Sequence, residues 1–311
     1  MPDQRTTILA GTDEGLHVWK EERAAAVDEL AGREVSALAA DGGHWWAIAD
    51  GRELWQSADA LHWTLAATVA KGKPRATCLA STVSGLLVGT ARAHLARLSH
   101  GRLVSVASFD EAEGRDAWYT PWGAPADVRS ISADGDRAVY VNVHVGGVLR
   151  SAGGDAGWSP TLDIEHDVHQ VLAVPGHAGT VVVAAADGFG ITEDAGRTWR
   201  WDNAGLHAHY CRAVAVAGDT LLLSAATSYQ GRQACVYRRP LSGGAPFERC
   251  RAGLPDWFPD NVDTGCLATR ERTAVIGTED GCVYVSGDAG ESWSTLAKSL
   301  SPVRAVALAP A

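Results

Sequence analysis

The apolar positions of this chain fall in short runs separated by turns that are rich in glycine and aspartate. Apolar runs that end in a small-residue turn occur at 86–90, 181–185 and 274–278, and a glycine-led run follows at 281–286. Runs of about four to eight residues bounded by turn residues are typical of β-strands. No segment shows a convincing helical period of about 3.6 residues. The pattern therefore predicts an all-β protein.

A repeated octapeptide marks where these strands turn. It occurs as TEDAGRTW at 192–199 and as SGDAGESW at 286–293, with degenerate copies at 57–63 and 151–158. In such a turn, aspartate accepts hydrogen bonds from backbone amides, glycine adopts a positive φ, and tryptophan anchors the next strand. The tryptophans that end the four copies are 95, 41 and 94 residues apart. The underlying unit therefore has about 41–47 residues, and the chain holds about seven units.

Each unit contains four short strands, and a repeat of this kind is typical of β-propeller blades. The C-terminal segment 303–308 has the form of a first strand with nothing after it, whereas 7–19 has the form of a second and a third strand without a first. Together the two ends complete one blade and close the ring. We therefore predict a single seven-bladed propeller of four-stranded blades over 1–311. The closing blade comprises 302–311 and 5–30, and the others lie at about 35–68, 75–109, 127–163, 167–204, 209–253 and 262–299.

The octapeptide matches Ser/Thr-x-Asp-x-Gly-x-x-Trp, which is the Asp-box or bacterial neuraminidase repeat (BNR). The chain thus resembles the BNR-like propellers, grouped with the YVTN and WD-repeat folds, over essentially its whole length. The resemblance implies a distant relation to sialidases, other exo-acting glycosidases, sortilin-type receptors and photosystem II assembly-factor propellers. A true sialidase is not expected, because the Arg-Ile-Pro start motif is absent and sialidases have six blades. The box is a structural turn, so Asp194 and Asp288 are expected to hold turns rather than to catalyse.

Composition and charge exclude some classes of binding partner. The chain has 37 acidic and 27 basic side chains and a net charge of −10, which argues against a nucleic acid or an anionic membrane as partner. No apolar run approaches the roughly 20 residues that span a bilayer, and residues 1–11 show no signal-peptide pattern. Six cysteines without a Cys-x-x-Cys spacing are expected to be free thiols. We therefore expect a soluble, cytoplasmic monomer, and the alanine-, glycine- and arginine-rich composition suggests a bacterial source.

Ligands of propellers usually bind at one mouth of the central channel, where the blades converge. Alignment of the first strands places six residues in one register toward this mouth: Ser36, Thr77, Arg129, His169, Arg212 and Arg304. In the remaining blade the position falls on Asp263 or Gly265. Three arginines from three blades are suited to bind a carboxylate, phosphate or sulfate through guanidinium forks. Alternatively, each arginine forms an ion pair with a neighbouring carboxylate such as Asp127, Asp167 or Asp263.

Histidines form a second candidate cluster near the same mouth. His144 follows a second strand, whereas His169 and His209 belong to the segments that lead into the next two blades. Three imidazoles from three successive blades can hold zinc, iron or copper, so these three residues are candidate metal ligands. The alternative is a set of hydrogen-bonding and stacking histidines around the channel, because loop histidines are common and no His-Glu-x-x-His motif occurs. No cofactor other than such a divalent transition metal is indicated.

Two loops, 116–125 and 255–260, are rich in aromatic residues and proline, and 227–233 is an unusually long loop within a blade. Loops that exceed their counterparts in a repeat protein commonly carry function. Their aromatic side chains either stack on a sugar or another ring, or cover the channel and pack on one another. These side chains are Trp118, Tyr119, Trp122, Tyr229, Trp257 and Phe258.

We predict a BNR-like propeller that binds a small anionic or sugar-like ligand at the mouth of the channel. The ligand-binding residues expected there are Arg129, His169, Arg212, Arg304, Tyr229, Trp257 and Trp118. One alternative is an enzyme at the same mouth, either a glycoside hydrolase or lyase that uses carboxylates, or a histidine-ligated metalloenzyme. For this alternative the candidate catalytic residues are Asp167, Asp263 and His169. The other alternative is a protein-interaction scaffold, whose partner is a protein.

Overall fold

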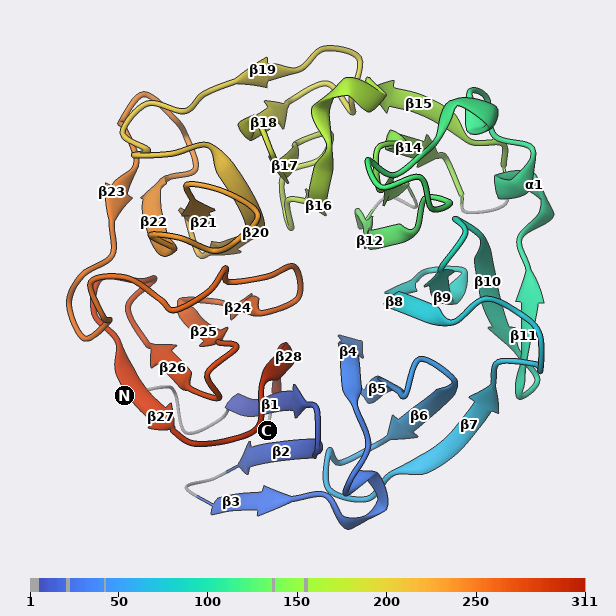
Figure 1. Cartoon of the computed structure of the whole chain (residues 1–311), viewed down its shortest axis with the longest axis horizontal. Coiled ribbons are helices and arrows are strands. Elements are labelled where there is room, and N and C mark those ends of the chain that lie inside the picture. The colour runs from blue at the N-terminus through green and yellow to red at the C-terminus, as the bar shows by residue number, and fades with distance from the viewer. Residues whose placement is uncertain (1–5, 21–22, 42, 136–137, 154–155, 311) are drawn as a thin grey trace.

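The computed structural model describes residues 6–20, 23–41, 43–135, 138–153 and 156–310. Within this part of the chain, the strands form seven four-stranded antiparallel sheets around a central axis (Figure 1). The prediction of a seven-bladed, all-β propeller is therefore confirmed. The helices are short and lie in the connections: η1 (Asp28–Leu30), α1 (Ala107–Asp110), η2 (Arg115–Ala117) and η3 (Ile164–His166).

In each blade one strand lies nearest the axis and the last lies at the rim (Figure 1). The closing blade contains β28 (Val303–Pro310), β1 (Thr6–Thr12), β2 (Gly15–Lys20) and β3 (Arg23–Ala26). The next blade contains β4 (Val35–Asp41), β5 (His44–Ala49), β6 (Glu53–Ser57) and β7 (Thr64–Thr68). It is followed by β8 (Ala76–Thr82), β9 (Gly85–Thr90), β10 (Leu95–Ser99) and β11 (Arg102–Ser105).

The other four blades continue around the ring in chain order (Figure 1). The first contains β12 (Val128–Ala133), β13 (Val139–Val143), β14 (Gly147–Ser151) and β15 (Ser159–Leu162). The second contains β16 (Val168–Ala173), β17 (Val181–Ala185), β18 (Gly188–Thr192) and β19 (Arg200–Trp201). The third contains β20 (Tyr210–Ala217), β21 (Thr220–Ala226), β22 (Cys235–Pro240) and β23 (Glu248–Arg249). The fourth contains β24 (Leu267–Arg270), β25 (Thr273–Gly277), β26 (Val283–Ser286) and β27 (Ser294–Ala297).

The hydrophobic core lies between neighbouring blades. The strands β13, β17 and β25 are buried at every position, because sheets pack against both of their faces. One cluster joins Val182 and Phe189 of one blade to Leu221 and Leu223 of the next. Burial on both faces explains why these strands read as unbroken apolar runs rather than as an alternation of apolar and polar residues.

The C-terminal strand closes the ring. Strand β28 pairs antiparallel with β1 over the whole length of both, from Thr6 opposite Pro310 to Thr12 opposite Val303. Gly11 lies where the closing blade meets the next one, and a Cβ atom there would approach the carbonyl oxygen of Val35 to 2.5 Å. A side chain at this position would therefore push the two blades apart. The predicted closure by the two chain ends is confirmed.

The octapeptide at 286–293 forms a closed turn between β26 and β27. The hydroxyl of Ser286 and the backbone N–H of Ser292 both donate to Asp288 Oδ1, at 2.7 and 2.9 Å. Burial would raise the pKa of Asp288, but the hydrogen bonds from Ser292 and Ser286 more than offset this and lower it to about 2. The indole of Trp293 is buried behind the turn. The aspartate thus holds the turn that positions the fourth strand.

The other copies vary in how completely they repeat this turn. At 192–199, Thr198 donates to Asp194 through both its N–H and its hydroxyl, at 2.9 and 2.7 Å. At 57–63, Asp59 accepts the backbone N–H groups of the shorter turn. Asp155, the aspartate of the copy at 151–158, lies outside the described residues.

All six cysteines are free thiols in the structure, as their spacing suggested. Five of them are buried, and burial raises the pKa of the Cys250 thiol to about 12. In the described ranges, no helix has the length and apolar character needed to cross a membrane.

The turn at Asp288 gives the first testable prediction. Replacing Asp288 with alanine removes an acceptor of three hydrogen bonds and is expected to lower the free energy of unfolding by about 1 kcal/mol, since the group is partly exposed. The folded-state pKa lies below the ordinary value, so the wild-type advantage is present at neutral pH and disappears as the pH falls through about 2. Urea unfolding measures both effects.

The control is Asp256→Ala, which removes a side chain that is 88% exposed. It should leave the unfolding midpoint close to that of the wild type. An Asp288→Ala variant as stable as this control at neutral pH would show that the aspartate does not hold the turn.

Candidate functional site

A β-bulge lies at the start of the innermost strand in six of the seven described blades. In five of them the pairing with the neighbouring strand skips one residue, and in the blade of β20 it skips two, Arg212 and Ala213. Such a bulge turns the extra side chain in a new direction. The residues at the bulges are Ser36, Thr77, Arg129, His169, Arg212 and Arg304. They are the six residues that strand alignment places in one register. The bulge explains why residues that share this register lie at the channel.

A cavity of about 340 Å³ opens where these strands begin. Five of the six bulge residues line it, whereas the side chain of His169 is only 1% exposed and lies behind the wall. Loops between blades and between second and third strands complete the lining. The polar residues that line it are Ser36, Thr77, Asp127, Arg129, His144, Arg212, Asn261, Asp263, Thr264, Glu279 and Arg304, and Trp122 is its aromatic residue.

Arg304 forms the most extensive ion pair of the cavity. Its Nε and Nη2 atoms donate to the two carboxylate oxygens of Asp13 at 2.6 and 2.8 Å, and Nη1 donates to Glu279 Oε2 at 2.5 Å. The hydrogen bond from Arg304 lowers the pKa of Asp13 below its ordinary value. Since Arg304 lies on β28 and Asp13 in the turn between β1 and β2, this pair also crosses the seam where the ring closes.

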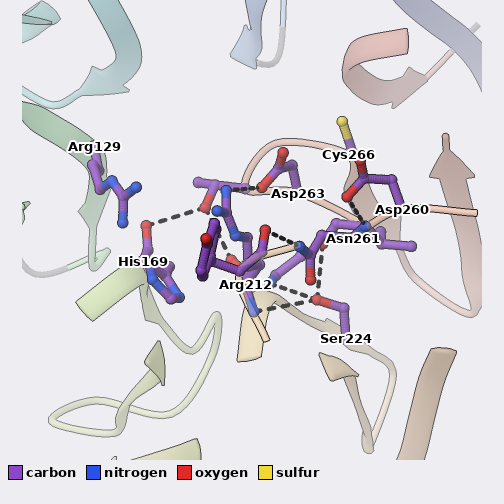
Figure 2. A network of polar contacts seen from close by, with 12 residues as sticks. Arg129, His169, Arg212, Ser224, Asp260, Asn261, Asp263 and Cys266 are labelled. Atoms are coloured by element: carbon purple, nitrogen blue, oxygen red, sulfur yellow. Dashed lines mark hydrogen bonds and ion pairs between the residues drawn. The ribbon is translucent and has the colours of Figure 1, made fainter. Parts of the chain in front are cut away.

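The other two arginines are paired as well. Arg212 Nη1 donates to Asp263 Oδ1, and Nη2 lies 3.3 Å from the hydroxyl of Tyr210 (Figure 2). The Arg129 guanidinium lies farther from its partner, with 3.8 Å between Nη1 and Asp167 Oδ1. Arg129 Nη1 is buried and has no hydrogen-bond partner among the described residues. All three arginines at the cavity are therefore in ion pairs, and the pair made by Arg129 is the loosest.

Two histidines face the carboxylate of Asp167. His144 Nε2 lies 3.5 Å from Asp167 Oδ1, and His169 Nε2 lies 3.6 Å from Oδ2. His169 Nδ1 bonds the carbonyl of Cys211, which only accepts, so Nδ1 carries the proton and Nε2 is bare in the neutral ring. Figure 2 shows His169 beside Arg212, on the neighbouring blade.

The protonation of these histidines is set mainly by burial. Burial lowers the pKa of His144 to about 4, and the positive charge of Arg129 acts in the same direction. Burial likewise lowers the pKa of His169. At neutral pH both rings are uncharged. Burial would raise the pKa of Asp167, and the positive charge of Arg129 acts against this effect and favours the ionised carboxylate.

The metal site suggested by His144, His169 and His209 is not assembled. His209 is exposed and is not part of the cavity wall. Among the described residues, no group of three histidine, cysteine, aspartate or glutamate side chains is placed to hold a metal ion. The first two histidines instead share Asp167.

Some of the aromatic candidates pack against other side chains, whereas others are largely exposed. Trp118 lies against Phe109 and under the guanidinium of Arg115, and Trp257 lies under Arg249, whose guanidinium carbon is 3.7 Å from the ring centroid. Neither tryptophan lines the cavity. Both therefore have a packing role in the described structure.

Two further aromatic side chains are largely exposed. Tyr229 is 69% exposed and lies outside the cavity wall, although its carbonyl accepts a hydrogen bond from Asn261, which lines the cavity. Trp122 is 68% exposed, lines the cavity, and packs edge-on against His144 with 4.8 Å between ring centroids. Trp122 is thus the aromatic residue that a ligand in the cavity would meet.

Strand alignment did not identify two groups of site residues. Asp13 and Glu279 lie in turns between strands, and nothing local in the sequence connects them to Arg304, which is 291 residues from Asp13. Asn261 and Thr264 lie in the long connection to β24, where the register of the first strand could not be aligned. Thr264 Oγ1 lies within 3.1 Å of two backbone carbonyl oxygens, one from each of the two preceding blades, a contact that no sequence spacing reveals.

The histidine pKa values predict how stability depends on pH. The pKa of His144 is lower in the folded protein than in the unfolded chain, so the unfolded chain binds the proton first. The free energy of unfolding therefore falls as the pH drops from 6.5 to about 4. We expect His144→Gln to make this decline shallower by about 1 kcal/mol per pH unit. Urea unfolding between neutral pH and about pH 4.5 gives the slope.

His209→Gln, which removes an exposed imidazole outside the cavity, is the matched control. It reports the effect of losing a histidine that does not face Asp167. Equal slopes for the wild type and His144→Gln would contradict the assignment of a buried, neutral ring.

The fold is shared with solved structures of low sequence similarity. YCF48 from Cyanidioschyzon merolae matches with a TM-score of 0.59 and 14% identity, over 91% of this chain and 88% of that chain. The WD40 β-propeller domain of Doa1 matches with a TM-score of 0.58 and 14% identity, over 92% of this chain and 83% of that chain. A GH74 xyloglucanase from Xanthomonas campestris matches with a TM-score of 0.60 and 14% identity, over 94% of this chain.

The chain spans 47% of the xyloglucanase, which is less than half the length of that enzyme. No protein-family model matches the sequence, and no curated protein matches it. At these identities the similarities show that the chain is a β-propeller.

Proposed function

We propose that this chain is an Asp-box-type propeller that binds a small, polyhydroxylated, sugar-like ligand in the axial cavity. The observation that carries the proposal is that guanidinium–carboxylate pairs line the cavity and stay partly exposed to it. A hydroxyl group both donates and accepts hydrogen bonds. Neighbouring hydroxyls on one sugar ring therefore match the donor and acceptor that each pair presents side by side.

The same pairs weigh against a purely anionic ligand. An anion would have to compete for the guanidinium groups with carboxylates that are already bound to them, including Asp263 on Arg212 and both acids on Arg304. The three guanidinium groups are also outnumbered by nearby carboxylates, so the local charge repels an anion. These carboxylates are Asp13, Asp127, Asp167, Asp263 and Glu279.

Shape and surface chemistry support a ring-sized ligand. A volume of about 340 Å³ is at the lower end of the range for small-molecule sites. Trp122 offers a large, exposed apolar surface at the wall, opposite a lining that is otherwise mostly polar. One apolar face combined with several convergent polar groups is the arrangement that orients a small ligand.

The test is a thermal-shift screen followed by titration calorimetry. We expect at least one neutral mono- or disaccharide to raise the melting temperature in a saturable way, and to do so more strongly than sulfate, phosphate or citrate. Trp122→Ala should weaken its binding by about tenfold, which corresponds to about 1.4 kcal/mol of lost contact.

Tyr119→Ala is the matched control, because Tyr119 is exposed in the same loop and is not part of the cavity wall. This variant should bind within about twofold of the wild type, which is less than 1 kcal/mol. Binding of the anions alone, or of none of the compounds, would overturn the proposal, as would an unchanged affinity in Trp122→Ala.

A further inference from the structure

We propose that the ligand carries an ammonium group, so that the compound class the cavity fits best is an amino sugar, with Asp127 as the partner of the ammonium. This inference rests on the proposed binding of a sugar-like ligand and specifies its chemistry. Asp127 is the one lining carboxylate of the described structure that takes part in no ion pair.

Asp127 is held in place by its neighbours. Its Oδ1 atom accepts the backbone N–H of Arg92 at 2.9 Å, and its backbone carbonyl accepts the N–H of His144 at 2.9 Å. The residue immediately precedes β12 and lines the cavity. The carboxylate therefore occupies a defined position at the wall.

No charged side chain compensates Asp127. In the described ranges it takes part in no ion pair, whereas the other two carboxylates of the wall, Asp263 and Glu279, pair with Arg212 and Arg304. The nearby imidazole of His144 does not compensate Asp127 either, because burial keeps that ring uncharged at neutral pH. Asp127 thus carries an unbalanced negative charge at the cavity.

A ligand that fills the cavity removes water from this carboxylate. Displacing water from a charge without supplying an opposite charge or hydrogen bonds is unfavourable. A neutral sugar supplies only hydroxyl donors, and an acidic sugar adds a like charge. An ammonium group supplies both the opposite charge and the hydrogen bonds, so among these groups it binds most favourably beside the carboxylate.

The aromatic wall favours the same group. Trp122 packs on His144, whose backbone N–H binds the backbone carbonyl of Asp127, and Trp122 and Asp127 line the same cavity. Cations are attracted to the face of a tryptophan ring. An ammonium beside Asp127 therefore lies in a cavity whose wall also contains the indole.

The experiment compares ligands that differ only at one substituent. Calorimetry at slightly acid pH, where the amine is protonated, measures glucosamine, glucose, N-acetylglucosamine and glucuronate against the wild-type protein, with putrescine as an amine that lacks the sugar ring. We expect glucosamine to bind about tenfold more tightly than glucose, glucuronate to bind most weakly, and the preference for glucosamine to shrink as salt is raised.

Asp127→Asn removes the charge and keeps an acceptor oxygen for the Arg92 amide. This variant should bind glucose as the wild type does and lose the preference for glucosamine. Asp116→Asn is the matched control, because it removes one charge from an exposed residue of the same loop that is not part of the cavity wall. It should retain the preference.

The outcomes separate this inference from the proposed function. If glucose and glucosamine bind equally well to the wild type, the ammonium assignment is wrong and the sugar site stands. A preference that persists in Asp127→Asn also overturns the assignment. Putrescine binding as tightly as glucosamine would overturn the amino sugar as the compound class, because the sugar ring would then contribute nothing. If no sugar binds, the proposed function fails as well. The salt dependence in the wild type tests the assignment even if Asp127→Asn does not fold.

Discussion

The pairing of β28 with β1 is the constraint on which the rest of the molecule depends. It joins the two ends of the chain in one sheet and covers the edge of β1 that would otherwise be unpaired. Because the ring is closed, seven blades must converge on one axis (Figure 1). The closing strand also carries Arg304, whose ion pair with Asp13 joins the seam to the cavity. Closure and the candidate site are therefore built from the same residues.

The geometry around the axis is fixed by side chains that reach from one blade to the next. Five backbone carbonyls lie at the start of an inner strand or in the segment that leads into one, and a side chain of the preceding blade donates to each. His169 is one of these donors, which explains why a buried histidine can be structural even though it lies beside the site. The carbonyls are those of Val128, Val168, Cys211, Val262 and Val303. The charged groups of the cavity are thus positioned before any ligand arrives, which reduces the entropic cost of binding.

Much of the architecture could be predicted from the sequence, because a blade is a local unit whose turns and apolar strands recur along the chain. The alignment of Arg129, Arg212 and Arg304 followed from the same repeat. The sequence also offered Asp167 and Asp263 as ion-pair partners, and these carboxylates pair with Arg129 and Arg212. The partners of Arg304 could not be predicted, because Asp13 meets Arg304 only after the ring closes, across 291 residues. The sequence also did not show which aromatic residues pack against other side chains and which line the cavity. Spacing cannot distinguish Trp118, which packs in the core, from Trp122 in the same loop, which lines the cavity.

The most direct test of the account is a crystal structure of the protein soaked with the saccharide that stabilises it most. We expect electron density for the sugar in the axial cavity, with the ring against Trp122 and hydroxyl groups within hydrogen-bonding distance of the Arg212–Asp263 pair. Density at the rim of the propeller or at the turns on its opposite face, with an empty axial cavity, would contradict it.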